Sequence, residues 1–431
     1  MNLLASLISI FITLAVSAPL RAAQPAVDAQ TPAVRAAVRV LLARFFSGAK
    51  RIYVSADGPF TVKDEAGNLV ASGTSSSSLC VTLSPASGAG GEPGRLQVVD
   101  PAYAGQNSTD DADVLPVMVR IAPADPAGSI QIGAATGTKR LAYRGVLEVS
   151  VNSGGALRIV NVIGIEDYLA GVLKPEIGGD APVEALKAQA VAARTYAVRN
   201  LGRLWADGAD IDDSNRCQNY MGRSAETPAV LQAVDQTRGE VLIYNGAVID
   251  ALYCTECGGM TAEGPASEPY LRPVATAACA AKPGWTFAIS PADFGARLRQ
   301  DAGDATGDIT KVEIAKADAS GRALQVLVTG RDGTRTITGI RLRQILGVDN
   351  LRSTKFTVKI RDDRALVFTG QGWGHGLGMC QAGAIARASG ANPETYASIL
   401  ADYYPGTQLT KLSASLIRRA GPLPAASLSR R

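Results

Sequence analysis

The sequence predicts an α+β fold made mainly of antiparallel β-sheets, with one prominent helix. Short runs of alternating apolar and polar residues recur along most of the chain, which is the pattern of half-buried strands. Glycine accounts for 45 of the 431 residues, which suits many tight turns. One stretch, between residues 181 and 204, instead repeats its apolar residues at helical spacing.

Residues 1–23 are predicted to be a signal peptide. The uncharged apolar run from Leu3 to Ala18 is shorter than the roughly 20 residues that span a bilayer, and the small residues after it suit cleavage near Ala22 or Ala23. An uncleaved anchor is the alternative. We expect residues 24–37 to be a linker and the rest of the chain to be exported to the periplasm or cell envelope, because no later stretch is long and apolar enough to span.

Residues 38–139 are predicted to form an N-terminal β-rich region. Three strands separated by turns at Asp57-Gly58 and Gly67-Asn68 open it. The glycine- and serine-rich residues 84–95 and the acidic patch Asp110–Asp113 are predicted to be solvated loops.

Residues 140–285 are predicted to form a core segment. Two β-rich runs flank Asn152–Gly155, which is a strong hairpin signal. Beyond the hairpin, the helix over residues 181–204 can be capped by Asp180, and Pro182 fits its first turn. The apolar stripe of this helix is mostly alanine, which would let another backbone approach closely.

Residues 286–411 are predicted to form a C-terminal β-rich region. It contains three alternating runs with turn signals, a short helix at "IRLRQILG", and strands over residues 354–369. These strands lead into "QGWGHGLGMCQAGA". Residues 412–431 are a basic tail.

The charge balance gives little reason to expect nucleic-acid binding. Lysine and arginine total 43 against 39 acidic residues, so the net charge is only +4. A mildly basic surface would still tolerate an anionic polymer.

His375 is the single histidine of the chain and lies between two glycines. One histidine cannot build a multi-histidine zinc centre, and a Ser-His-Asp triad would have to use His375. The flanking glycines would let the backbone pass close to a ligand and present the imidazole at the floor of a cleft. The alternative is a turn in which the imidazole only binds a neighbouring backbone group.

Glu176 is a candidate general acid. It lies between Pro175 and Ile177, just before the predicted helix, and apolar neighbours would favour the neutral form of its carboxyl group. Glutamates near a helix N-terminus are also common as simple dipole partners. Glu184 lies three residues before Lys187, so we interpret it as a surface ion pair.

The cysteines allow two interpretations. In an exported chain six cysteines suggest disulfides, although 15 pairings are open. Four of them could instead ligate zinc, but their spacing matches no common zinc finger; these are Cys217, Cys254, Cys257 and Cys279. We favour a disulfide, for instance Cys217 with Cys257, and predict no metal or other cofactor.

Several stretches together resemble the stage II sporulation protein D family, the amidase-enhancer group. "IEDYLAGVLKPEIG", "PVEALKAQAVAARTYAV", "CQNYMG", "TRGEVLIYNG", "CGGMT", "YLRPV" and "GWGHGLGMCQAGA" occur in the family's order. The likeness runs from about Val38 to Leu409, and its first and last motifs are long and specific. The resemblance implies the family's fold, with the helix at the catalytic site.

The resemblance implies a lytic transglycosylase that cuts peptidoglycan between N-acetylmuramic acid and N-acetylglucosamine, preferably in glycan without peptides. Glu176 matches the position of the family's catalytic glutamate. Five further residues are expected to bind the glycan: His375, Gln218, Tyr220, Gln381 and Arg194. Sporulation itself is not implied, because the family extends well beyond spore formers.

The alternative function is a non-catalytic wall-binding protein that stimulates a cell-wall amidase, as other relatives are described. A cysteine-based redox or metal protein would leave the two long motifs unexplained. One relative binds zinc through cysteines and a histidine near the "CQ" motif, but here Arg216 precedes Cys217. This departure puts a Cys/His zinc site in doubt.

Overall fold

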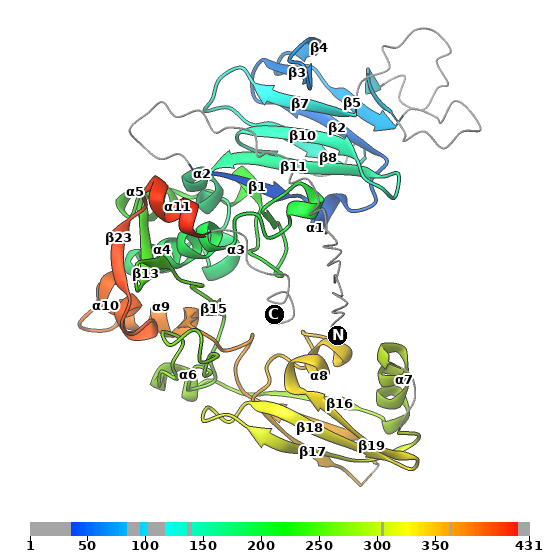
Figure 1. Cartoon of the computed structure of the whole chain (residues 1–431), viewed down its shortest axis with the longest axis vertical. Helices are drawn as coiled ribbons and strands as arrows, with labels where there is room; N and C mark the ends of the chain where they lie inside the picture. Colours follow the sequence, from blue (N-terminus) through cyan, green and yellow to red (C-terminus); the bar gives the residue numbers. More distant parts are fainter. Residues whose placement is uncertain are drawn as a thin grey trace, which may run out of the picture. The chain divides into compact units, whose positions relative to one another are not determined.

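The computed structural model describes residues 36–83, 95–101, 117–135, 140–302, 306–362 and 364–420 (Figure 1). It confirms the α+β class, with many antiparallel strands beside a group of helices. The predicted signal peptide, nearly all of the linker, the loop over residues 84–94, the acidic patch and the end of the basic tail lie outside the described residues.

A seven-stranded sheet has the order β12-β1-β11-β10-β7-β3-β4. Its neighbours are antiparallel except for β1 and β12, which are parallel. The predicted hairpin at Asn152–Gly155 is confirmed, because it joins β10 to β11. The strands are β1 (Ala37–Leu41), β3 (Phe60–Asp64), β4 (Leu69–Gly73), β7 (Met118–Pro123), β10 (Val146–Val151), β11 (Leu157–Gly164) and β12 (Ile211–Asp212).

A five-stranded sheet has the order β6-β5-β2-β8-β9. All three strands predicted between residues 51 and 73 form, but the turn at Asp57-Gly58 carries the chain from this sheet into the seven-stranded one. Asp57 fixes that crossing, because its carboxylate accepts hydrogen bonds from the N–H and hydroxyl of Ser129. The strands are β2 (Arg51–Ala56), β5 (Leu79–Leu83), β6 (Leu96–Val99), β8 (Ile130–Gly133) and β9 (Leu141–Tyr143).

Helix α4 (Val183–Arg199) is the predicted helix, but it is shorter at both ends. Asp180 does not cap it, since Pro182 occupies the N-cap position without a side-chain hydrogen bond. It ends early because Asn200 leaves helical geometry and Gly202 has a φ of +79°. Thirteen of its residues are buried, so it is surrounded by protein on most sides, where the sequence predicted a single stripe.

Six helices pack against α4, and together with it they form the helical part of the main core. Three come from the middle of the chain and three from its C-terminal part: α2 (Ile165–Ala170), α3 (Leu173–Ile177), α5 (Pro228–Gln236), α9 (Gln381–Ser389), α10 (Tyr396–Tyr403) and α11 (Ala414–Ala420). Glu184 pairs with Lys187 at 2.6 Å, as predicted, and its other oxygen accepts the N–H of Tyr396 at 2.7 Å. The surface pair therefore also anchors the start of α10.

A second hydrophobic core lies between residues 285 and 368. The three predicted strands form an antiparallel sheet, and the short helix follows them. Residues 379–404 pack in the main core instead, so the predicted C-terminal region contributes to both cores. The elements are β16 (Trp285–Ile289), α7 (Pro291–Ala302), β17 (Ile309–Ala317), β18 (Ala323–Gly330), β19 (Gly333–Thr338), α8 (Gly339–Leu346), β20 (Phe356–Ile360) and β21 (Leu366–Gly370).

Short strands and helices complete the described chain. β15 (Tyr253–Cys254) runs parallel to β22 (Met379–Cys380) and so joins the core segment to the histidine-bearing stretch. The others are α1 (Ala43–Phe46), β13 (Glu240–Tyr244), β14 (Ala247–Val248), α6 (Ala277–Ala280) and β23 (Gln408–Lys411). None of the helices in the described ranges combines the length and the apolar character that a membrane crossing requires.

Candidate active site

Glu176 lies on the five-residue helix α3, which packs against α4. The helix ends at Ile177, and its C-cap residue Gly178 has a φ of +93°, a conformation that suits glycine. The Glu176 side chain is half-buried, and its Oε1 accepts the N–H of Asn219 at 2.6 Å. A short helix and a backbone donor therefore hold this carboxyl group at the protein surface.

Gln218 is fully buried, and both the oxygen and the nitrogen of its side-chain amide form hydrogen bonds. The Tyr168 hydroxyl donates to its Oε1 at 2.9 Å, and its Nε2 donates to the Tyr253 hydroxyl at 2.9 Å. Burial raises the pKa of Tyr168 well above its ordinary value, so this hydroxyl stays a donor. Because Gln218 directly precedes Asn219, these bonds position the N–H that contacts Glu176.

Tyr220 is also fully buried. Its hydroxyl donates to Asn161 Oδ1 at 2.7 Å, and its ring lies 5.1 Å from the ring of Tyr168. A side chain at Gly171 would place its Cβ 2.4 Å from the Tyr220 ring, so that glycine is required for the packing. The arrangement favours a supporting role over the sugar contact that the sequence suggested.

Arg194 is fully buried in the middle of α4. Its guanidinium binds both oxygens of Glu166, at 2.5 and 3.1 Å, and donates to the backbone carbonyl oxygens of Glu240 and Val234. With its donors engaged inside the core, Arg194 ties α4 to α2 and β13. The structure thus favours a stabilising role for it, and sugar binding by Arg194 stays an untested prediction.

His375 lies in a segment whose glycines at 372, 374, 376 and 378 all have positive φ, between +66° and +106°. This backbone favours glycine, as the sequence indicated. The imidazole is half-buried, and its Nδ1 accepts the N–H of Leu377 at 3.0 Å. Because Nδ1 is the acceptor, Nε2 carries the proton in the neutral ring.

Trp373, in the same segment, is a functional candidate that sequence reasoning missed. Its side chain is 41% exposed, and the Arg352 guanidinium lies 4.7 Å from the ring centroid. An exposed aromatic ring beside an imidazole is a suitable platform for a sugar. Its position in the "GWGHG" motif was the available signal.

A chain of contacts joins the Glu176 and His375 segments. Gln218 bonds to Tyr253, and Tyr253 pairs with Met379 across the parallel strands β15 and β22. Gln381, which is 3% exposed, donates to Gln189 of α4 at 3.3 Å. The two long motifs therefore meet in one core, while the prediction that Glu176 and His375 line the same groove stays a prediction.

A cavity of about 730 Å³ lies beside α6, α9 and the end of α10. Its lining includes residues 272–278, Arg387, Asp402 and Tyr403, but neither Glu176 nor His375. This cavity is therefore distinct from the predicted glycan site.

The cysteines differ from the sequence prediction. No disulfide links any of the six buried cysteines, so none joins Cys217 to Cys257 in the structure. Cys257 instead groups with Cys279 and Cys380. Cys380 was left out of the predicted metal set because its closeness depends on the pairing of β15 with β22.

The residues around Cys217 do not form a Cys/His zinc site of the kind that one relative has, which the sequence had put in doubt. Cys217 is not part of the cysteine group, and the chain's single histidine lies in another segment. The side chain of Arg216 is 71% exposed and lies 3.8 Å from Asp212.

Asp213 lies in the loop before Gln218, and its raised pKa can be tested through the pH dependence of the protein's stability. It is fully buried, and burial raises its pKa from 3.8 to about 6, while the N–H of Arg44 donates to its Oδ1 at 2.7 Å. The folded state then binds more protons than the unfolded state between these pKa values. Stability should fall as the pH rises from about 4 to about 6 and stay at the lower level above that range.

We expect Asp213→Asn to remove this loss, since the amide keeps an acceptor for Arg44 but cannot ionise. The variant should be more stable than the parent above pH 7 by on the order of 2 kcal/mol. Urea unfolding from pH 4 to 8 measures the difference, with Asp235→Asn at an exposed site as the control. Parallel pH profiles for parent and Asp213→Asn would contradict the assignment.

Comparisons with known proteins agree with the motifs. A family model described as "Stage II sporulation protein" matches residues 153–244, which include α3, α4 and Gln218. A model of a domain of unknown function matches residues 284–378, which include the second core and His375.

Three relatives extend the match beyond these segments. An uncharacterised protein of Brachyspira hyodysenteriae is 38% identical over 261 residues, covering 58% of this chain and 68% of the relative. The amidase enhancer of Bacillus subtilis is 31% identical, covering 56% of this chain and 40% of the relative. Stage II sporulation protein D of Bacillus subtilis is 32% identical over 284 residues, covering 60% of this chain and 77% of the relative. This chain belongs to the stage II sporulation protein D family.

Proposed function

We propose that this chain is an exported peptidoglycan lytic transglycosylase in which Glu176 is the catalytic acid and base. The observation that carries the proposal is the half-buried Glu176 carboxyl group, oriented by the Asn219 N–H at 2.6 Å. By the resemblance of its motif, Glu176 matches the family's catalytic glutamate, and it lies near the end of a short helix that packs against the buried helix α4. Membership of the family supports a role at the cell wall.

The proposed reaction needs only one carboxyl group. Glu176 gives its proton to the glycosidic oxygen as the bond from that oxygen to C1 of N-acetylmuramic acid breaks. The 6-hydroxyl oxygen of the same sugar then bonds to C1, and its proton passes to the Glu176 carboxylate. The products are a 1,6-anhydromuramyl end and a free N-acetylglucosamine hydroxyl, and the acid is regenerated. Hydrolases normally use two carboxyl groups, because water must also be activated or replaced by a nucleophile.

The remaining residues divide into two groups by exposure. His375 and Trp373 are accessible on the glycine-rich segment, so we assign them contacts with the glycan. The imidazole Nε2–H can donate to a sugar hydroxyl or acetamido oxygen, and the indole can lie against a sugar face. Gln218, Tyr220 and Gln381 are buried, and we assign them the positioning of the two segments.

The direct test is product analysis. Purified mature chain should convert peptide-stripped glycan strands into fragments with 1,6-anhydromuramyl ends, which are lighter by one water than hydrolysis products. Mass spectrometry of defined glycan strands distinguishes the two. Products with reducing muramic acid ends would show a hydrolase and overturn the single-carboxyl mechanism, and the absence of any product would reject the enzyme.

A second candidate function rests on the relative named amidase enhancer. In that case the chain would bind wall glycan, release no fragment and increase the turnover of a cell-wall amidase. The same digest, repeated with a purified amidase, separates the two functions. Faster amide cleavage without anhydro products would favour the enhancer.

A further inference from the structure

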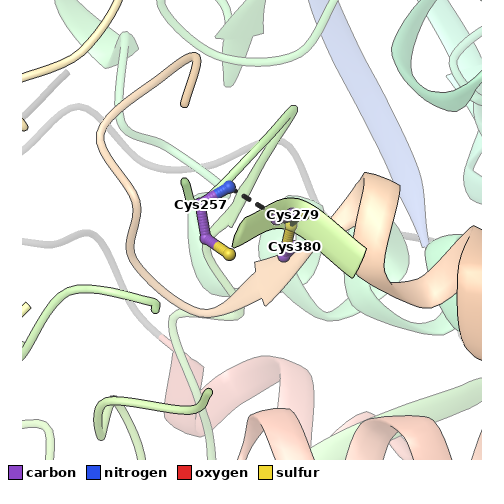
Figure 2. Close-up of side chains that lie close together, drawn as sticks. All are labelled: Cys257, Cys279 and Cys380. Carbon is purple, nitrogen blue, oxygen red and sulfur yellow. Dashed lines mark hydrogen bonds between the residues drawn. The ribbon is translucent and has the colours of Figure 1, made fainter. Parts of the chain in front are cut away.

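Four buried cysteines from three segments of the main core lie around Cys380. The Sγ atoms of Cys257, Cys279 and Cys380 all lie within 4.8 Å of one another, and those of Cys279 and Cys380 are 3.3 Å apart (Figure 2). Cys254 is the register partner of Cys380 across β15 and β22, and it lies outside the group of three whose sulfurs are mutually within 4.8 Å. These four side chains are at most 4% exposed.

The fold is shaped to bring these segments together. The parallel pair of β15 and β22 sets Cys254 opposite Cys380. After Cys257, a Cβ at Gly258 would lie 2.9 Å from the backbone of Gln371, and one at Gly259 would lie 3.2 Å from Ala280. Both glycines have positive φ, so the "CGG" turn allows the close approach of α6 and the His375 segment.

Backbone donors surround the central sulfur. Cys380 Sγ accepts the N–H of Cys257 at 3.3 Å, drawn in Figure 2, and the N–H of Gly383 at 3.4 Å. It also occupies the N-cap of the nine-residue helix α9. N–H···S bonds of this kind orient metal-bound sulfurs.

A buried cation beside the cluster lacks a counter-charge. Arg322 is 2% exposed, and its Nη2 donates to the carbonyl oxygen of Cys257 at 2.7 Å. Its Nε and Nη1 have no hydrogen-bond partner, and no carboxylate of the described residues pairs with it. An uncompensated buried guanidinium is costly, and negatively charged sulfurs at the cluster would offset part of that cost.

A disulfide cannot account for the arrangement as well as a metal can. A disulfide joins two sulfurs at about 2.05 Å, whereas the sulfur of Cys380 lies close to those of both Cys257 and Cys279. Tetrahedral zinc with Zn–S bonds of about 2.3 Å holds its sulfurs about 3.8 Å apart. This value falls between the 3.3 Å that separates the Sγ atoms of Cys279 and Cys380 and the 4.8 Å within which the three sulfurs of the group all lie.

We propose that Cys257, Cys279 and Cys380, with Cys254 as the fourth ligand, bind one Zn²⁺ ion in a structural site. The bound ion links the "CGG" turn and α6 to Cys380, in the segment that follows His375. Arg322 extends this link, because a Cβ at Gly376 would lie 2.3 Å from its guanidinium carbon. The site does not depend on the proposed glycan chemistry, since its ligands include neither Glu176 nor His375.

The test uses the full mature chain, purified without chelators, and measures bound zinc by elemental mass spectrometry. We expect about one zinc ion per chain and four cysteines that resist alkylation until a chelator is added. Cys380→Ser and Cys279→Ser should each lower the zinc content at least fivefold. Cys80→Ser and Cys217→Ser are matched controls, because both thiols are buried and lie outside the group, so both variants should keep the metal.

A measurement on the parent chain tests the proposal even if the cysteine variants do not fold. Metal-free protein refilled with Co²⁺ should develop the intense near-ultraviolet absorption of thiolate-to-cobalt charge transfer, and added Zn²⁺ should abolish it. Folded, zinc-free protein whose intact mass shows two disulfides would overturn the proposal. Zinc content that persists in Cys380→Ser would overturn it as well.

Discussion

Glu176→Gln is expected to abolish glycan cleavage, lowering the rate by about 10³-fold or more, because the amide cannot deliver the proton that the leaving oxygen needs. The amide oxygen can still accept the Asn219 N–H, so the local hydrogen bond survives. The half-buried position leaves room for an isosteric side chain. Activity should therefore disappear while stability and glycan binding remain.

Anhydro-product release measured by mass spectrometry, together with urea unfolding, separates these effects. Glu184→Gln is the matched control: it lies eight residues further on, and its amide can still accept the Tyr396 N–H. That variant should keep nearly full activity. Anhydro products formed at the parent rate by folded Glu176→Gln would remove Glu176 from the mechanism.

The sequence predicted those parts of the fold in which local signals and tertiary packing agree. The hairpin at Asn152–Gly155 forms because Asn152 Oδ1 accepts the N–H groups of Gly154 and Ala156, and the turn chemistry is local. Asp57-Gly58 was recognised as a turn for the same reason. The choice of sheet on either side of it depends on pairing with β5, β7 and β8, whose partners are distant in sequence.

The site was predictable as a set of motifs but not as an arrangement. Glu176 and His375 were identified from their motifs, and the structure finds both half-buried. Polar residues such as Gln218 and Arg194 were expected to meet the glycan, yet both are fully buried and bonded within the core. Periodicity could not indicate this, because α4 is enclosed on most sides and its polar partners come from α2 and the segments after α5.

Arg194→Met is expected to destabilise the protein by about 3–5 kcal/mol, because it removes one partner of a buried ion pair. Glu166, which is 17% exposed, would keep only the Gly239 N–H, and two backbone carbonyl oxygens would each lose one donor. Urea unfolding measures the change. If Arg194 instead served mainly to bind sugar, the variant would fold normally and show only weaker glycan binding.

A double-variant cycle tests whether the loss comes from an orphaned charge. Removing both partners of a buried pair costs less than removing one, so Arg194→Met combined with Glu166→Met should recover part of the stability lost in the single variant. Arg238→Met is the control, because that arginine is 61% exposed and pairs with Asp235 on the surface, where a change within about 0.5 kcal/mol is expected. Strictly additive losses in the double variant would mean that Arg194 stabilises α4 through packing and its backbone contacts, without a net contribution from the charge of Glu166.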